Sequence, residues 1–166
     1  MKKIAFYVEG QTEQFFLNKL LIEIAGIKNI CLILRKFNGR SRPPTQEIYP
    51  KSVSQPVNPS HTALIYNCGN DEGVKTRILE EYQDLTNDGF NEIIGIRDLF
   101  PLTDLTRLET RLKNGLPSRG EIPLPANTSI VIAVHEVEAW FLAECNHFTC
   151  IDSNLTEALV ASNYPS

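Results

Sequence analysis

The stretch IAFYVEGQTE, residues 4–13, contains a complete transition from strand to turn to helix. Its first part, Ile4–Val8, is apolar throughout, as expected of a strand that is covered on both faces of a sheet. Gly10 allows a tight turn, Thr12 is the expected helix cap, and Glu13 lies in the first helical turn, where the helix dipole favours negative charge. The stretch therefore predicts a buried strand followed directly by a helix.

The same alternation of strand and helix patterns continues along the chain. Four further runs have the length and composition of buried strands: Ile30–Leu34, Thr62–Tyr66, Glu92–Ile96 and Ser129–Val134. Strands that alternate with helices favour parallel pairing, because the helices act as crossover connections. The sequence therefore predicts an α/β domain with a mainly parallel, Rossmann-like sheet of five strands and helices on both faces.

The helical segments show one apolar face each. In the first, Phe16, Leu20 and Ile24 share a face with Leu21 beside them, and Gly26 is the expected end. The second helix follows the turn Asn67–Gly73, and the third is expected to begin at Pro101. The inward positions expected in these two helices are Ile78, Leu79, Tyr82, Leu85, Leu105, Leu108 and Leu112.

The regions between and after these elements set the domain limits. Phe37–Ser60 contains five prolines and no sustained periodicity, which predicts a long loop. Residues 1–145 are expected to form the α/β domain, and residues 146–166 a C-terminal extension. Within the extension, Leu155–Ala161 has the length of a helix but no clear packing partner, which suggests that the chain is a fragment of a longer protein.

Composition limits the function classes. The chain has 166 residues, 42% hydrophobic and 22% charged, which suits one globular domain. A net charge of -4 argues against a broad basic surface for nucleic acid, but leaves room for a local basic patch or a metal-bridged phosphate contact. No apolar segment is long enough to span a bilayer, so we expect a cytoplasmic protein without membrane contact.

The four cysteines, Cys31, Cys68, Cys145 and Cys150, show no CxxC spacing. In a reducing compartment they are most simply free thiols. A metal site formed by Cys145, His147 and Cys150 is the alternative, and it lacks a fourth ligand at suitable spacing.

Acidic side chains follow several of the predicted strands. Glu9 follows the first strand, Asp98 the fourth, and Glu136 and Glu138 the fifth. Because the carboxyl ends of parallel strands meet at one edge, these carboxylates should share a rim. Their mutual repulsion would be relieved by a divalent cation, and Mg²⁺ or Mn²⁺ suits oxygen ligands and phosphate substrates.

Purely structural interpretations compete with this one. Glu9 could cap the following helix, and Asp98 could be a turn or cap residue. Glu136 and Glu138 could form a solvated rim. Asp71 reads as a helix-start residue and His135 as a satisfied strand-end histidine.

Two further features could bind phosphate at the same rim. Arg97 is either a phosphate clamp or the partner of a rim carboxylate. Gly10, Gln11 and Thr12 lie at a helix start, where backbone N–H groups attract anions.

Two segments resemble a known family. Val8–Glu13 (VEGQTE) resembles the VEGxTE signature of Toprim-like proteins of the DUF4276 and OLD-nuclease type, and Glu136–Glu144 (EVEAWFLAE) is similar to a segment of the DUF4276 group. Ile93–Asp98 occupies the place where a Toprim strand delivers its acidic DxD motif. The resemblance covers residues 1–145.

This resemblance implies a Toprim-like fold with a Mg²⁺-dependent phosphodiester site. It places Glu9 close to the metal, with a role in proton transfer, and Asp98 as a metal ligand. The chain departs from the motif, because Leu99 and Phe100 follow Asp98 and the second Asp is missing. Glu136 or Glu138 would have to supply the second carboxylate.

Three functions remain open on this basis. The first is a Mg²⁺-dependent, nuclease-like enzyme that acts on DNA or RNA in defence or genome maintenance. The second is a non-catalytic Toprim-like module that binds a nucleotide, a nucleic acid or a partner ATPase. The third is a structural or interaction domain.

Overall fold

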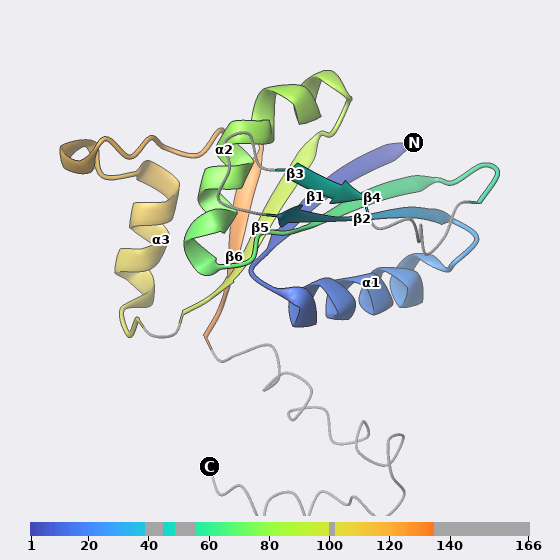
Figure 1. Ribbon diagram of the computed structural model, residues 1–166, viewed down its shortest axis with the longest axis horizontal. Helices are drawn as coiled ribbons and strands as arrows, with labels where there is room; N and C mark the ends of the chain where they lie inside the picture. The colour runs from blue at the N-terminus through green and yellow to red at the C-terminus, as the bar shows by residue number, and fades with distance from the viewer. Residues whose placement is uncertain (39–44, 49–55, 100–101, 135–166) are drawn as a thin grey trace, which may run out of the picture.

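The computed structural model describes residues 1–38, 45–48, 56–99 and 102–134. These residues form one sheet with helices on both faces (Figure 1). No helix in the described ranges is long and apolar enough to cross a membrane.

Five strands run parallel in the order β2-β4-β1-β5-β6, which confirms the predicted α/β architecture. Their bounds are β1 Lys2–Val8, β2 Ile30–Asn38, β4 His61–Asn67, β5 Glu92–Asp98 and β6 Thr128–Ala133. The central strand β1 pairs with β4 on one side and β5 on the other, with Val8 opposite Asn67 and Ile96. The carboxyl ends of β1, β4 and β5 therefore lie side by side.

A sixth, short strand corrects the prediction of a continuous loop from Phe37 to Ser60. β2 extends to Asn38, and β3 (Thr45–Ile48) pairs antiparallel with it, with Thr45 opposite Asn38 and Ile48 opposite Arg35. The prolines flank β3 and none lies within it, so its backbone can pair with the edge of β2. The many prolines of residues 37–60 made the whole segment look like a loop, although β3 itself contains none.

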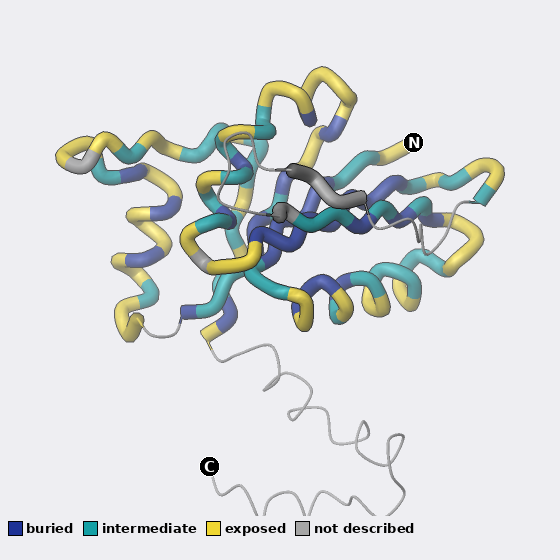
Figure 2. Tube along the Cα trace, viewed as in Figure 1, coloured by how far each residue is buried: buried dark blue, intermediate teal, exposed yellow. Residues whose placement is uncertain are grey.

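The helices divide between the two faces. α1 (Gln11–Ala25) covers one face, while α2 (Asp71–Asn87) and α3 (Leu105–Asn114) lie on the other (Figure 1). β1 shows the alternation directly, because Phe6 and Val8 belong to the apolar cluster under α1, and Ala5 and Tyr7 to the cluster under α2. The central strands are accordingly the most buried part of the molecule (Figure 2).

The buried face of α1 differs from the predicted one. Leu17 is buried, and Phe16 and Leu21 are partly buried, but Leu20 and Ile24 are exposed. The helix is rotated so that two polar residues, Glu13 and Gln14, also face inward. Their hydrogen bonds to the backbone, described below, hold the helix in this orientation. As predicted, Gly26 ends α1.

The second and third helices follow the predicted faces but begin elsewhere. α2 begins at Asp71 rather than after Gly73, with the Asn70 side chain accepting from the Gly73 N–H at 2.7 Å. α3 begins at Leu105, capped by Asp104, whose carboxylate accepts from the Arg107 N–H at 2.9 Å, so the predicted start at Pro101 is wrong. The predicted inward positions lie as follows: Ile78, Leu85, Leu108 and Leu112 are buried, and Leu79, Tyr82 and Leu105 are partly buried. A 3₁₀ turn, η1 (Pro117–Arg119), lies between α3 and β6.

Candidate functional site

Glu9 and Asp98, which are 89 residues apart, meet where β1 and β5 end. Glu9 Oε1 accepts a hydrogen bond from the backbone N–H of Asp98 at 2.7 Å. The parallel register explains the contact, because β1 ends at Val8, opposite Ile96, while β5 continues to Asp98. The structure therefore places the two predicted residues at one edge of the sheet.

The Glu9 carboxylate also completes the hydrogen bonding of this edge. On the far side of β5, the Leu99 N–H donates to the Ala133 carbonyl at 2.8 Å. The Asp98 N–H points the other way, where β1 has already ended, and the Glu9 side chain takes the place of a backbone acceptor. A buried N–H without an acceptor is costly, so Glu9 has a structural role beside any chemical one.

The helix-cap interpretation of Glu9 is wrong, and so is the prediction of Thr12 as the cap. Gly10 is the N-cap of α1, and the Glu13 carboxylate accepts from the Gly10 N–H at 2.9 Å. Glu13 thereby becomes a buried part of the cap, while Thr12 is exposed in the first turn.

Arg97 lies beside this pair of carboxyl residues. Its Nε is 4.0 Å from Glu9 Oε1 and donates to the Asp98 carbonyl at 3.5 Å, and the side chains of Arg97 and Glu9 are only 11% and 12% exposed. The geometry is that of a partner to a rim carboxylate, and the role of phosphate clamp stays a prediction.

The N-terminus of α1 lies at the same edge of the sheet. Gln11 and Thr12 are exposed there, directly after the end of β1. Backbone N–H groups at a helix start attract anions. Phosphate binding at Gly10, Gln11 and Thr12 therefore stays a prediction that this placement favours.

The end of β4 is polar and tightly organised. Asn67 is buried, and its side-chain oxygen accepts from the Gly69 N–H at 3.0 Å, which shapes the turn into α2. The next residue, Cys68, is also buried, and its N–H donates to the Val8 carbonyl at 2.8 Å. Asp71 is the first residue of α2, as its interpretation as a helix-start residue predicted.

The Cys68 thiol is a poor candidate nucleophile. Burial raises its pKa to about 12, and although the nearby Arg77 opposes this shift, the negative charge of Glu9 adds to it. The thiol therefore stays protonated at neutral pH, whereas the thiolate is the reactive form. Cys31 and Cys68 are both free cysteines, as expected.

Gln14 organises the same edge and was missed by sequence reasoning. It is almost fully buried, and its Nε2 donates to the Ile65 carbonyl at 3.0 Å and to the Arg35 carbonyl at 2.9 Å. The side chain thereby ties α1 to β4 and β2. No pattern signals this role, because a glutamine near a helix start normally reads as a solvent-facing residue.

The remaining predicted site residues, Glu136 and Glu138, lie outside the described residues, as do His135, Cys145, His147 and Cys150. The described part of β6 ends at Ala133, which pairs with Asp98 at the site edge. Within the described ranges, no three His, Cys, Asp or Glu side chains are grouped to hold a metal ion. A metal site would thus need oxygen ligands beyond Glu9 and Asp98.

These observations define a mainly parallel α/β protein with an acidic pair where the central strands end. A family model described as "Domain of unknown function (DUF4276)" matches residues 8–161, so the chain belongs to the DUF4276 family. The matched region includes Glu9, Asp98, Glu136 and Glu138. Comparison with curated proteins and with solved structures gave no match.

Proposed function

We propose that this protein carries a Toprim-like, Mg²⁺-dependent site that processes phosphodiester bonds of nucleic acid. The observation that supports the proposal is the meeting of Glu9 and Asp98 at the end of adjacent parallel strands, with 2.7 Å between Glu9 Oε1 and the Asp98 nitrogen. Sites in open parallel sheets form at this edge. The proposal extends to the biological role of such an activity, which would be defence or genome maintenance.

The residues at this edge fit Mg²⁺ in their chemistry. Carboxylate oxygens are its preferred protein ligands, and one or two are enough when phosphate and water complete the shell. Glu9 and Asp98 would hold the ion, together with Glu136 or Glu138.

Each residue has a defined part in the proposed reaction. Bound Mg²⁺ would supply Lewis-acid stabilisation of the charge that develops on the phosphate. Glu9, oriented through Oε1, would exchange a proton with the attacking water through Oε2. Arg97 and the N–H groups of Gln11 and Thr12 would orient the phosphate oxygens.

A non-catalytic binding module is the second candidate, and the sequence after Asp98 favours it. In a DxD motif the second Asp would stand at position 100, where this chain has Phe100. The segment after β5 therefore supplies one carboxylate where the Toprim motif would supply two. A module of this kind would bind a nucleotide, a nucleic acid or a partner ATPase without turnover.

Two experiments on the full chain separate these candidates. We expect Mn²⁺ to bind in titration calorimetry and plasmid DNA to be nicked when Mg²⁺ is present. Glu9→Gln and Asp98→Asn should abolish nicking while the fold stays intact, because both replacements keep the shape of the side chain. Metal binding or nucleic-acid binding without nicking would support the binding module.

Matched controls are available away from the site. Glu92→Gln removes a carboxylate at the opposite end of β5, where Glu92 pairs with Lys2 at 2.9 Å, and Asp88→Asn changes an exposed residue after α2. Both control variants should nick DNA as the unmodified protein does. Full activity of Glu9→Gln together with Asp98→Asn would refute the proposed site.

A further inference from the structure

A cavity of about 840 Å³ lies between α2 and α3, beside the end of β5. Apolar side chains line much of it: Leu79 from α2, Leu108 and Leu112 from α3, and Ile122 from the segment before β6. Ile122 is 59% exposed, so apolar surface is open to solvent at the mouth. The volume lies within the range of small-molecule sites.

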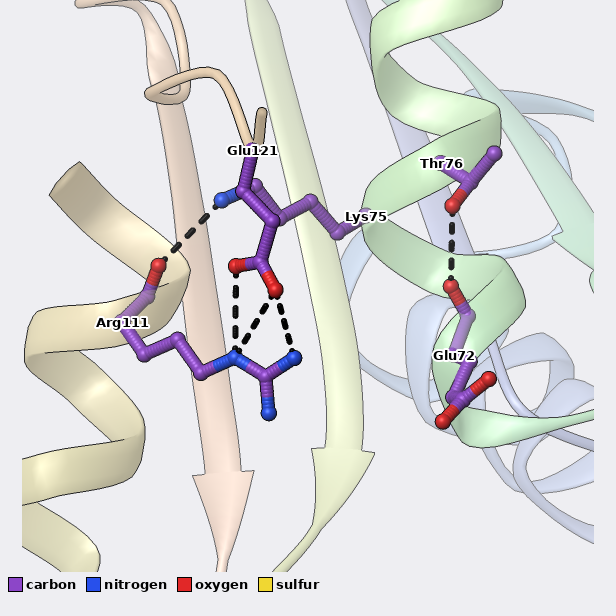
Figure 3. Close-up of polar contacts among 5 residues, drawn as sticks. All are labelled: Glu72, Lys75, Thr76, Arg111 and Glu121. Atoms are coloured by element: carbon purple, nitrogen blue, oxygen red, sulfur yellow. Dashed lines mark hydrogen bonds and ion pairs between the residues drawn. The ribbon is translucent and has the colours of Figure 1, made fainter. Parts of the chain in front are cut away.

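Polar groups form another part of the wall (Figure 3). Lys75 extends from α2 toward α3, where its Nζ donates to the Arg111 carbonyl at 3.2 Å. Arg111 and Glu121 form an ion pair, with 2.6 Å between Nη2 and Oε1. Of the two other acidic residues of the wall, Glu80 is paired with Arg77 at 2.6 Å, and Glu72 lies at an exposed position of α2. Two of the three acidic side chains of the wall are thus paired with arginine.

The Lys75 ammonium has bonding capacity to spare. An ammonium has three donors, and in the described part of the chain Lys75 uses one of them, on the Arg111 carbonyl. Partial burial lowers the pKa of Lys75, and the Arg111 charge acts in the same direction, although Glu121 opposes both. An anionic group of a ligand would bring this half-buried cation a stronger partner than a carbonyl.

Arg97 joins this cavity to the candidate site. It lines the cavity and also lies 4.0 Å from Glu9 and within hydrogen-bond reach of the Asp98 carbonyl. An anion held at the Arg97 end of the cavity would therefore lie next to the Glu9 and Asp98 edge. A ligand that joins an apolar body to an anionic group would match both parts of the wall.

We infer that the cavity binds a nucleoside monophosphate unit, with the base against Leu79, Leu108 and Ile122 and the phosphate between Lys75 and Arg97. The inference rests on the proposed function, and it names the substrate unit recognised beside that site. The unit could be a free nucleotide or an unpaired nucleotide of a single strand, because both present the same base and phosphate.

The test is titration calorimetry on the full chain in the presence of EDTA. The probes are AMP, adenosine, inorganic phosphate, hexanoate and a short oligothymidylate. AMP should bind more tightly than adenosine or phosphate, because it uses both parts of the cavity. An oligothymidylate that competes with AMP would identify the strand as the source, and lack of competition would identify the free nucleotide.

Two variants assign the binding to the cavity. Lys75→Met should weaken AMP about tenfold or more and leave adenosine unchanged, since it removes a charge-assisted hydrogen bond. Ile122→Glu should weaken both AMP and adenosine. Lys19→Met and Ile24→Glu change exposed residues of α1 and should leave both affinities unchanged. Thermal unfolding of each variant verifies that it is folded.

The outcomes separate this inference from the proposed function. No AMP binding, unchanged AMP binding in both cavity variants, or hexanoate binding as tight as AMP would overturn the inference. Nicking of DNA without AMP binding would overturn the inference alone. AMP binding by an unmodified protein that does not nick DNA would uphold the cavity and overturn the phosphodiester proposal.

Discussion

Glu9 has a structural role in addition to the chemical role that we propose for it. Its carboxylate replaces the backbone acceptor that β1 no longer offers to Asp98, and the same bond fixes the position of its oxygens. A fixed carboxylate is what a metal site needs, because ligands that are already oriented lose less entropy on binding. The structural role therefore supports the proposed chemical one.

Removing the Glu9 carboxylate should destabilise the protein. Glu9→Ala leaves the Asp98 N–H without its acceptor, and we expect a loss of about 1–3 kcal/mol in the free energy of unfolding. Glu9→Gln keeps an acceptor oxygen and should lose less. Urea denaturation measures both, with Glu92→Ala as the control at the opposite end of β5. Equal stability of Glu9→Ala and the unmodified protein would contradict this role.

Cys68 should make stability depend on alkaline pH. Its pKa is about 12 in the folded protein, raised by burial from an ordinary 9.0. Above pH 9 the unfolded chain loses the thiol proton and the folded protein keeps it, so the free energy of unfolding falls as pH rises from 9 toward 12. Cys68→Ala should show a smaller fall over this window in urea denaturation. Parallel pH profiles of the two proteins would exclude the effect.

At the scale of elements, polar and steric contacts decide how helices sit on the sheet. Gln14 ties α1 to the ends of β2 and β4, and Gly95 lets α2 approach β5. Neither contact follows from hydrophobic periodicity. Both determine where the ends of the strands and the starts of the helices lie, and therefore the geometry of the candidate site.

Gln14→Leu should loosen α1 from the sheet. The replacement has a similar size but leaves the Ile65 and Arg35 carbonyls without this donor, and we expect a loss of about 1–3 kcal/mol. Gln11→Leu, at an exposed position in the same helix, is the matched control. Hydrogen exchange of α1 amides should accelerate in Gln14→Leu alone. Unchanged exchange would show that packing suffices to hold the helix.

A side chain at position 95 should fit only if α2 shifts away from β5. A Cβ at this position would lie 2.9 Å from Val74 Cγ1 and 3.2 Å from Ile78 Cδ1. Gly95→Ala should therefore destabilise the protein by about 1–3 kcal/mol through overpacking. Combining it with Val74→Ala removes the closest contact, so the double variant should be more stable than the sum of the single effects predicts. Strict additivity in thermal unfolding would contradict the contact.

For the molecule as a whole, the sheet order matters most. Placing β1 between β4 and β5 brings Glu9, Asn67 and Asp98 to neighbouring strand ends. The cavity between α2 and α3 opens beside the same edge through Arg97. A phosphate site and a base site would thus be adjacent on one side of the protein.

A metal that binds at this edge should stabilise the whole fold. Because a ligand that binds only the folded state adds stability by mass action, Mn²⁺ should raise the Tm in a concentration-dependent way. Glu9→Gln and Asp98→Asn should each reduce the rise, while Glu92→Gln leaves it unchanged. A rise that persists in both site variants would place the ion elsewhere.

The local pattern of apolar and polar residues was by itself enough to determine much of the fold. The five parallel strands, the three helices that the described ranges contain, and the position of Glu9 and Asp98 at strand ends all follow from apolar runs, Gly10, and the alternation of strand and helix. These features depend on residues close together in the sequence, so a single chain reveals them. The antiparallel β3 was missed because it is only 4 residues long and lies in a segment rich in proline.

Only the tertiary structure decided which atoms meet. The bond from Asp98 to Glu9, the burial of Gln14, the orientation of α1 and the cavity shared by Lys75 and Arg97 depend on the register between distant strands and on how closely helices approach them. Composition and periodicity carry no information on such distances. The physical reason is that a hydrogen bond requires its atoms to lie within about 3 Å, and only the packed chain sets distances at that scale.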